Sequence, residues 1–285
     1  MRTPDRSADH VWSTMGDWLA DRLPAYVDVA DMLAQGRFVD EDGRVVLAAD
    51  PYAPHRFVWF HRDLREEPEV TAPIHVVHRD ERLVVVDKPA FLSSIPRGRH
   101  VMQSAVVRLR AELGLPDLSP LHRLDRVTSG LLMLATEARW RGPYQTLFEH
   151  RAVAKTYWAL APLRADLELP VVVRNHLRKE RGSWQAEVVP GAPANAETLV
   201  ELESSGADGR GIYRLTPRTG RTHQLRVHLF GLGIPIVDDP LYPEVLDVEV
   251  DDFSRPLQLL ASELEFTDPV DGTPRRFVSA RTLPL

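Results

Sequence analysis

Residues 122–130, which read HRLDRVTSG, contain the side chains best suited to covalent chemistry. Asp125 lies in a turn-forming stretch directly before the apolar run 131–135, which has the length of a buried strand. A carboxylate at the end of a core strand can be held rigidly and still face a cleft, as a nucleophile or general base must. An Asp in such a stretch also commonly forms a turn or a helix cap. This segment alone leaves both interpretations open.

A second cluster, TGRTHQLRVH, covers residues 219–228. On a helix beginning near Thr222, the guanidinium of Arg226 would point partly toward the protein body. Burying an unpaired charge is costly, so a structural carboxylate or a ligand phosphate must meet it. If the partner is Asp125, the pair would keep that carboxylate ionised and aimed. The alternative is an ordinary arginine on a helix surface.

Two further segments could contact a polyanion. On a strand over residues 151–160, Lys155 and Tyr157 share one face, and an aromatic ring beside a cation suits a base turned out of an RNA stack. A tyrosine that only packs is the alternative. Arg97 and Arg99, in a Pro-Arg-Gly-Arg-His loop, could contact a substrate phosphate or form a solvated basic loop.

The elements that must position these residues follow from the apolar pattern. Strands are predicted at residues 74–77, 83–86, 131–135, 154–161, 197–202, 212–216 and 257–266, and helices at 101–113 and 222–232. Because the strands do not alternate regularly with helices, we expect an α+β fold with a mixed, largely antiparallel sheet. The polar, proline-containing stretch 64–73 has the composition of a linker. It divides the chain into a small module, residues 1–72, and a larger domain, residues 73–285.

Charge is distributed unevenly between these parts. Residues 1–72 hold 8 basic and 14 acidic side chains, which equals the net charge of −6 of the whole chain. Residues 73–236 hold 23 basic and 16 acidic side chains, an excess of 7 positive charges, whereas residues 237–252 hold seven acids and no base. The middle stretch could therefore bind a polyanion while the two acidic segments face elsewhere.

Composition narrows the remaining classes. The chain has no cysteine, so disulfides and thiolate chemistry are excluded, and a cytoplasmic location is the simplest expectation. The first residues lack the apolar stretch of a signal peptide, and no run approaches the length of a membrane helix. The histidines form no zinc-binding pattern such as HExxH, so we expect no metal. We expect a monomer.

Four motifs in a fixed order make the chain similar to the RluA-type family of pseudouridine synthases over roughly residues 73–285. They are the HRLDxxTSGLL segment from His122, the GRTHQLRVH segment from Gly220, the Asp87-Lys88-Pro89 turn after a strand, and Lys155-x-Tyr157. The resemblance implies isomerisation of specific uridines in ribosomal or transfer RNA to pseudouridine, without a cofactor. The fold that it implies is the α+β pseudouridine synthase domain.

The resemblance also implies roles for individual residues. Asp125 would be the nucleophile, Tyr157 would stack on or deprotonate the flipped base, and Arg226 would pair with Asp125. Arg123 would fill the space that the flipped nucleotide leaves. The same motifs supply further candidates for RNA contact: His122, Thr128, Arg221 and Lys155. Attack at C1′, attack at C6 and elimination to a glycal stay open, and each requires an ionised Asp125.

The N-terminal module and two other functions need separate consideration. Residues 11–62 loosely resemble an S4 RNA-binding module, yet their acidity would repel phosphate, so we expect a divergent or repurposed S4-like α/β module. A non-catalytic RNA-binding protein with the same fold would not need Asp125. A hydrolase using Asp125, Ser129 and His223 is a weaker alternative, since the chain has no GxSxG elbow.

Overall fold

The computed structural model describes residues 1–5, 12–25, 27–60, 66–96, 100–180, 182–249 and 252–285, which form two compact units, Met1–Arg65 and Glu66–Leu285. Residues 66–72 belong to the second unit. The Glu67 carboxylate accepts the backbone N–H groups of residues 101, 102 and 103, and Val70 is buried in the core of that unit. The structure therefore divides the chain at 65/66, whereas composition suggested 72/73.

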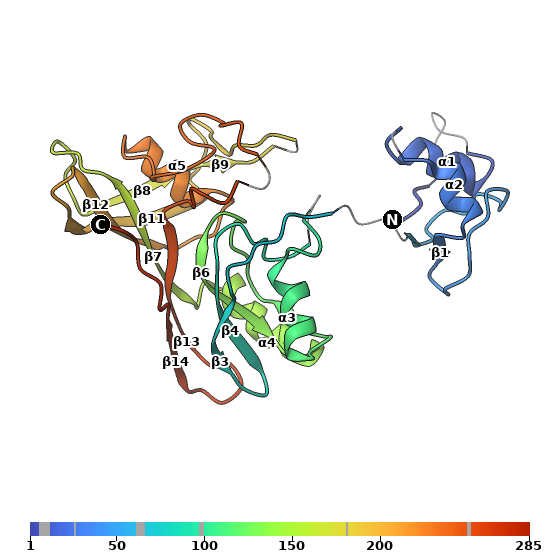
Figure 1. Ribbon diagram of the computed structural model, residues 1–285, viewed down its shortest axis with the longest axis horizontal. Coiled ribbons are helices and arrows are strands. Elements are labelled where there is room, and N and C mark those ends of the chain that lie inside the picture. The colour runs from blue at the N-terminus through green and yellow to red at the C-terminus, as the bar shows by residue number, and fades with distance from the viewer. Residues whose placement is uncertain (6–11, 26, 61–65, 97–99, 181, 250–251) are drawn as a thin grey trace. The chain divides into compact units, whose positions relative to one another are not determined.

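The first unit is built from two short helices and a two-stranded sheet (Figure 1). Helix α1 (Met15–Arg22) begins at a capping box in which Thr14 and Asp17 bond each other's backbone N–H groups. Helix α2 (Val29–Ala34) is capped by Asp28, and strands β1 (Phe38–Asp40) and β2 (Val58–Phe60) pair antiparallel. A separate core, which includes Trp18, stabilises this unit.

The second unit is organised around one ten-stranded sheet. Its strands follow the order β3-β4-β6-β13-β7-β12-β11-β8, with β14 beside β13 and β5 beside β6. Only the pair β6 and β13 is parallel; every other described pair in this sheet is antiparallel. The expected mixed, largely antiparallel α+β fold is therefore confirmed. The strands are β3 (His75–Arg79), β4 (Leu83–Lys88), β5 (Ser119–Pro120), β6 (Ser129–Ala135), β7 (Ala154–Pro162), β8 (Val171–Asn175), β11 (Ala196–Ser205), β12 (Arg210–Pro217), β13 (Leu259–Thr267) and β14 (Pro274–Val278).

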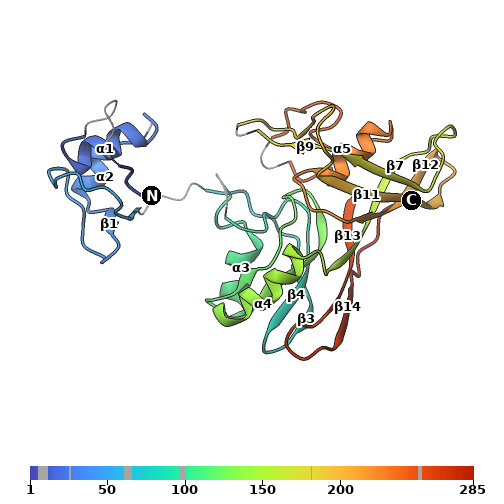
Figure 2. The ribbon, with the colours of Figure 1, turned by 180° about the vertical axis from the view of Figure 1, so that it is seen from behind.

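Strands β4 and β6 are buried on both faces, which explains their continuous apolar sequences. Val84 and Leu132 pack in a core with helix α3 (Ala105–Leu113), whereas their neighbours Val85 and Met133 pack in a core with helix α4 (Ala138–Glu149). Figure 1 shows α3 and α4 beside these strands, and Figure 2 shows the long β13–β14 hairpin beside β3 from behind. Helix α5 (Gln224–Gly231) contributes to the first of these cores.

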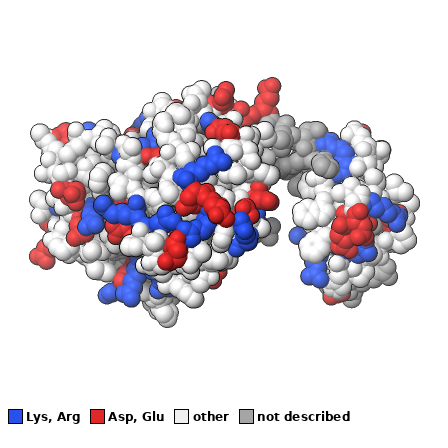
Figure 3. All heavy atoms as spheres, turned by 90° about the horizontal axis from the view of Figure 1, so that it is seen from below, with Lys and Arg blue, Asp and Glu red and all other residues white. Residues whose placement is uncertain are grey.

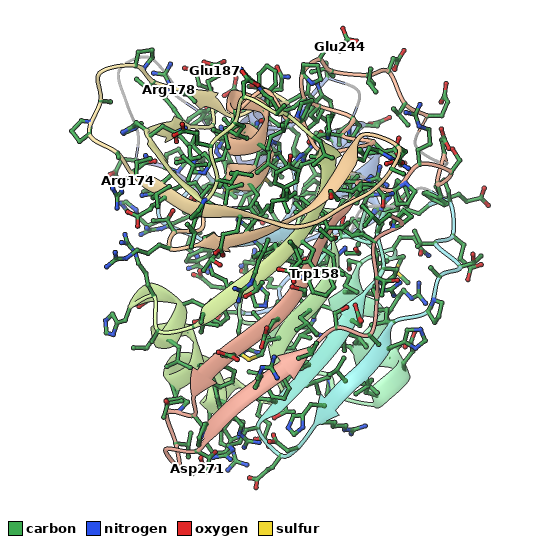
Figure 4. All side chains as sticks on the ribbon, turned by 90° about the vertical axis from the view of Figure 1, so that its left-hand side faces the viewer. Trp158, Arg174, Arg178, Glu187, Glu244 and Asp271 are labelled. Atoms are coloured by element: carbon green, nitrogen blue, oxygen red, sulfur yellow. The ribbon has the colours of Figure 1, made fainter. Side chains whose placement is uncertain are left out.

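Charged side chains lie at two opposite ends of the second unit (Figure 4). A small hairpin, β9 (Leu177–Arg178) with β10 (Glu187–Val188), lies between β8 and β11 in the chain. Figure 4 shows Arg174, Arg178 and Glu187 at one end of the unit, Asp271 at the opposite end, and Trp158 on the sheet between them. In Figure 3, acidic and basic side chains lie next to one another across one face of this unit. Across all of the described residues, no helix is long and apolar enough to cross a membrane.

Candidate active site

The loop that carries Asp125 is held on both sides of this residue. Ser94 Oγ donates to the carbonyl of Leu124 at 2.9 Å and accepts its N–H at 3.0 Å. The N–H of Thr128 donates to the backbone carbonyl of Asp125 at 3.1 Å, which closes a turn. The backbone of this loop is thus fixed by hydrogen bonds, while the Asp125 side chain stays 34% exposed.

Lys88, at the end of β4, connects the segment that follows this strand to the Asp125 loop. Its buried ammonium donates to the carbonyls of Pro89 at 2.8 Å, Leu92 at 2.7 Å and Arg126 at 3.4 Å. Burial lowers the pKa of Lys88 to about 7, and the nearby Asp125 carboxylate partly opposes this effect. The motif Asp87-Lys88-Pro89 was visible in the sequence, but the carbonyls that Lys88 binds were not.

Gly130 lets two strands approach each other directly after the loop. Its φ is +107°, and a Cβ built on it would lie 2.3 Å from the carbonyl oxygen of Ala261. Gly130 and Ala261 face each other in the parallel pair of β6 and β13. Only glycine fits there, because a side chain would both clash and strain the backbone.

Helix α5 is buried along most of its length, including its polar side chains. The Gln224 amide donates to the carbonyl of Glu197 at 3.0 Å and to Thr198 Oγ1 at 2.9 Å. His228 bonds Thr198 and Asn175, and burial lowers its pKa to about 4. These contacts fix the helix against β8 and β11. The motif QLRVH is therefore polar because its side chains tie the helix to the sheet.

Arg226 bonds two carboxylates at once, and its side chain is only 2% exposed. Its Nε and Nη2 donate to the two oxygens of Asp239 at 2.8 and 2.5 Å, and its Nη1 lies 3.5 Å from Asp125 Oδ2. The predicted partner Asp125 is thus present, but the closer partner is Asp239. Burial by itself would lower the pKa of Arg226, but the charges of Asp239 and Asp125 more than offset it, so the pKa is raised. Two details of the sequence interpretation are corrected: the helix begins at Gln224, and Arg226 is fully buried.

Asp239 is the site residue that sequence reasoning missed. It belongs to the acidic segment 237–252, which we expected to face away from the site. Its Oδ1 also accepts the N–H groups of Leu241 and Tyr242 at 2.8 and 3.2 Å. The signal that could have identified it is its place in the chain, between the apolar Ile236 and Tyr242, both of which are buried.

Tyr157 and Lys155 lie on β7 as predicted, and both are half-buried. Burial, with a smaller contribution from the Asp125 charge, raises the pKa of Tyr157 above its ordinary value. Burial lowers the pKa of Lys155. A hollow of about 310 Å³ adjoins Lys155 and is also lined by Arg151, Arg218 and Glu197. The cations outnumber the acids in this hollow.

The other predicted residues are distributed differently. Arg123 is exposed, and no contact of its guanidinium is present in the described part of the chain. His122 stacks on Phe148 and accepts the N–H of Met133, and burial lowers its pKa to about 3. It therefore packs beside α4 rather than beside the Asp125 carboxylate.

Of the last four candidates, the structure describes two, Thr128 and Arg221. Thr128 is buried in the turn after Asp125, and Arg221 is exposed with its Nε bonded to the carbonyl of Asn195 at 3.2 Å. Arg97 and Arg99 lie outside the described residues.

The described residues do not form the arrangement that a hydrolase or a metal site would need. Ser129 Oγ donates to the carbonyl of Leu259 at 3.3 Å, and within the described residues it makes no contact with His223 as a hydrolase would require. Among the same residues, no three acidic or histidine side chains lie together in a way that could hold a metal ion.

Comparison with known proteins gives one consistent result. The sequence profile of RNA pseudouridylate synthase matches residues 82–230. The chain is 32% identical over 207 residues to the dual-specificity RNA pseudouridine synthase RluA of Yersinia pestis, a match that covers 71% of this chain and 96% of the relative. It is 36% identical over 185 residues to pseudouridylate synthase RPUSD2 of Mus musculus, covering 62% of this chain but 32% of that longer protein.

Solved structures agree with the sequence matches. Human RNA pseudouridylate synthase domain containing 1 superposes with a TM-score of 0.57 at 25% identity, covering 77% of this chain and 94% of that one. Human RNA pseudouridylate synthase domain containing 4 gives 0.54 at 27% identity, covering 74% and 88%. With Asp125 and Arg226 side by side on this fold, the chain belongs to the RNA pseudouridylate synthase family, as an RluA-type member.

Proposed function

We propose that the protein converts uridine in RNA to pseudouridine with Asp125 as the nucleophile. The observation that carries the proposal is the geometry of this carboxylate: it is partly exposed, lies on a fixed loop, and has one oxygen 3.5 Å from a buried guanidinium. A charge held in this way is oriented without being sealed off from a substrate.

The reaction exchanges one bond of the uracil for another. The N1–C1′ bond breaks, the uracil turns in the site, and C5 bonds to C1′, after which the C5 proton leaves and N1 gains a proton. Asp125 supplies the electron pair that makes the first cleavage easier, either by covalent attack or by assisting elimination. The target nucleotide must leave its stack to reach the carboxylate. No step in this scheme needs a metal or cofactor.

The tyrosine suits stacking better than proton transfer. Because burial raises the pKa of Tyr157, its phenolate form is disfavoured at neutral pH. Its ring can still support the flipped uracil on one face. Arg123, which is exposed close to Asp125 in the chain, is suited to fill the space left by that base.

The RNA strand beside the flipped nucleotide would follow the basic hollow that Lys155 lines. Lys155 reaches toward Gly220, where an added Cβ would lie 3.7 Å from its Nζ. Arg151 and Arg218 line the same hollow. These cations would contact phosphates and so position the RNA without reading its sequence.

The substrate class is ribosomal or transfer RNA. The relatives include a dual-specificity RNA enzyme and, in Saccharomyces cerevisiae, a mitochondrial tRNA pseudouridine(32) synthase at 33% identity. We propose that the acidic unit Met1–Arg65 is a divergent S4-like module that does not grip RNA phosphate strongly. We further propose that the enzyme is cytoplasmic, monomeric and independent of metal. Light scattering would test the monomer, and activity in the presence of a chelator would test the independence of metal.

The experiment that tests the function is a comparison of pseudouridine maps of total RNA from cells with and without the gene. Loss of one or a few sites in ribosomal or transfer RNA, restored by the purified protein on unmodified transcripts, is the expected result. Identical maps, together with binding of the transcripts, would favour the non-catalytic RNA-binding alternative instead.

A further inference from the structure

His223 lies between the candidate nucleophile and a buried tyrosine. It directly precedes α5 and has a left-handed backbone conformation, with φ of 58°. Its Nε2 is 3.9 Å from Asp125 Oδ2, and its Nδ1 is 3.0 Å from the hydroxyl of Tyr242. The ring is 11% exposed, so these two neighbours dominate its surroundings.

Tyr242 determines which ring nitrogen carries the proton. The Tyr242 hydroxyl accepts the N–H of Ala186 at 2.7 Å, so its own proton is directed either to the carbonyl of Ala186 at 3.2 Å or to His223 Nδ1 at 3.0 Å. If the proton went to Ala186, the lone pair of Nε2 would face a carboxylate and repel it. Donation to Nδ1 instead leaves an N–H on Nε2, directed at Asp125.

The hydroxyl of Tyr242 is itself fixed by the β9–β10 hairpin. Ala186 directly precedes Glu187, which pairs with Arg178 across that hairpin. Figure 4 shows Arg178 and Glu187 at the same end of the unit as Glu244, which lies two residues after Tyr242. The hairpin therefore holds the tyrosine that orients the histidine.

The side chains of His223 and Arg226 both face the same oxygen of Asp125. Arg226 Nη1 lies 3.5 Å from Oδ2, and no residue that the structure describes makes a hydrogen bond or ion pair with Oδ1. Resting on the function proposed above, we propose that His223 is a positioning residue: with Arg226 it holds Oδ2 and leaves Oδ1 free to react with the uridine. The distance of 3.9 Å would have to shorten by about 1 Å to become a hydrogen bond, as such contacts do when a substrate closes the site.

The histidine can act in this way as a neutral ring. Burial lowers its pKa to about 4, against the opposing influence of Asp125 and Asp239 and with a further lowering by Arg226 and Lys179. At neutral pH it is therefore uncharged, and it can direct an N–H at Asp125 without adding a second cation. Tyr242 is the remaining titratable neighbour, and burial raises its pKa to about 12, so it also stays neutral.

Two substitutions separate the proposed role from simple packing. His223→Asn keeps a polar group near the position of Nδ1, and asparagine tolerates the left-handed conformation, but the side chain is too short to reach Asp125. His223→Gln places an amide N–H near the position of Nε2 and so keeps the donor. The probe is unmodified ribosomal and transfer RNA transcripts labelled with tritium at uridine C5, because the C5 proton is released on conversion.

The expected result is a loss of rate without a loss of binding. His223→Asn should lower kcat about 10- to 100-fold, the effect of removing one hydrogen bond to a charged group, and leave KM for RNA within about 2-fold. The acid limb of the pH–rate profile should move to higher pH, because the ionised carboxylate loses a donor. His223→Gln should recover most of the rate, and the melting temperatures should show that both variants are folded.

Two outcomes would overturn the proposal. One is an unchanged kcat and pH profile in a folded His223→Asn variant. The other is an equal loss in His223→Asn and His223→Gln, since only the first removes the donor. The proposed function fails separately: in that case the unaltered protein itself would release no tritium from any of the transcripts.

Discussion

Two short segments present a carboxylate to the same guanidinium, yet they do so in opposite ways. In the turn after Ile236, Asp239 gives both oxygens to Arg226, accepts two backbone N–H groups, and has a side chain that is 1% exposed. In the loop before β6, Asp125 gives one oxygen at 3.5 Å and is 34% exposed. The number of hydrogen bonds and the degree of burial thus distinguish the carboxylate that holds the fold from the one that is available to a substrate.

The difference follows from the energetics of buried charge. A guanidinium removed from water needs nearly complete pairing, and Asp239 provides it. Because that requirement is already met, Asp125 does not have to be buried to stabilise Arg226. The fixed guanidinium can then orient the second carboxylate at little cost, as a preorganised site requires.

The largest expected effect comes from removing the charge of the exposed partner. Asp125→Asn should reduce pseudouridine formation at least about 10⁴-fold, because an amide cannot act as the nucleophile. Since the two side chains are nearly isosteric and Asp239 still pairs with Arg226, the free energy of unfolding should change by less than about 1 kcal/mol. Tritium release and urea denaturation measure the two effects. Turnover at the normal rate would end the assignment of Asp125.

Removing the charge of the buried partner should act mainly on stability. Asp239→Asn removes the buried, bidentate anion of Arg226 and leaves only the partly exposed Asp125 at 3.5 Å, and breaking a buried pair in this way typically costs about 3–5 kcal/mol in the free energy of unfolding. A matched control is the neighbouring Asp238→Asn, because Asp238 pairs with the exposed Arg255 and should contribute less than about 1 kcal/mol. Equal denaturation midpoints for the two variants would contradict the assigned difference between the carboxylates.

Much of the fold was predictable because local patterns determine it. The continuous apolar sequences of β4 and β6 predicted buried strands, and the structure confirms both. Helix α4 was not predicted, because Pro143 lies inside it and its buried side includes the bulky Tyr144 beside several polar residues. Strand β14 was also not predicted, since its sequence PRRFV is charged and its stability comes from pairing with β13.

The candidate site was predictable only in part, for a related reason. The motifs identified Asp125 and Arg226, which lie 101 positions apart in the chain and 3.5 Å apart in space. Asp239 and Lys88 were not assigned, because their roles depend on tertiary contacts: one meets a guanidinium from another segment, and the other meets three loop carbonyls. The sequence shows which charged side chains are present, whereas their burial and the number of their hydrogen-bond partners decide their roles.

The loop of Asp125 also depends on the strand that follows it. Gly130→Ala should destabilise the protein by about 1–3 kcal/mol, because the residue has a φ of +107° and the new methyl group would meet the Ala261 carbonyl. The control is Gly142→Ala, within α4, where an added Cβ meets nothing within 4 Å and a stabilisation of up to about 1 kcal/mol is expected. Thermal unfolding measures both. Equal effects of the two substitutions would contradict the close approach of β6 and β13.

The last expected effect concerns the pH dependence of Lys88, and it accumulates over several pH units. The pKa of Lys88 is about 7 in the folded protein, and it returns to the ordinary value of 10.5 when the chain unfolds. Between these values the unfolded chain binds a proton that the folded protein does not, so this group makes stability rise with pH, by up to about 1.4 kcal/mol per pH unit. Lys88→Met removes the titration, so the difference in unfolding free energy between the two proteins should widen from pH 7 to pH 10 in favour of the unaltered one. Parallel pH profiles from urea denaturation would show that Lys88 keeps its proton in the folded protein over this range, as an ammonium held by the three carbonyls.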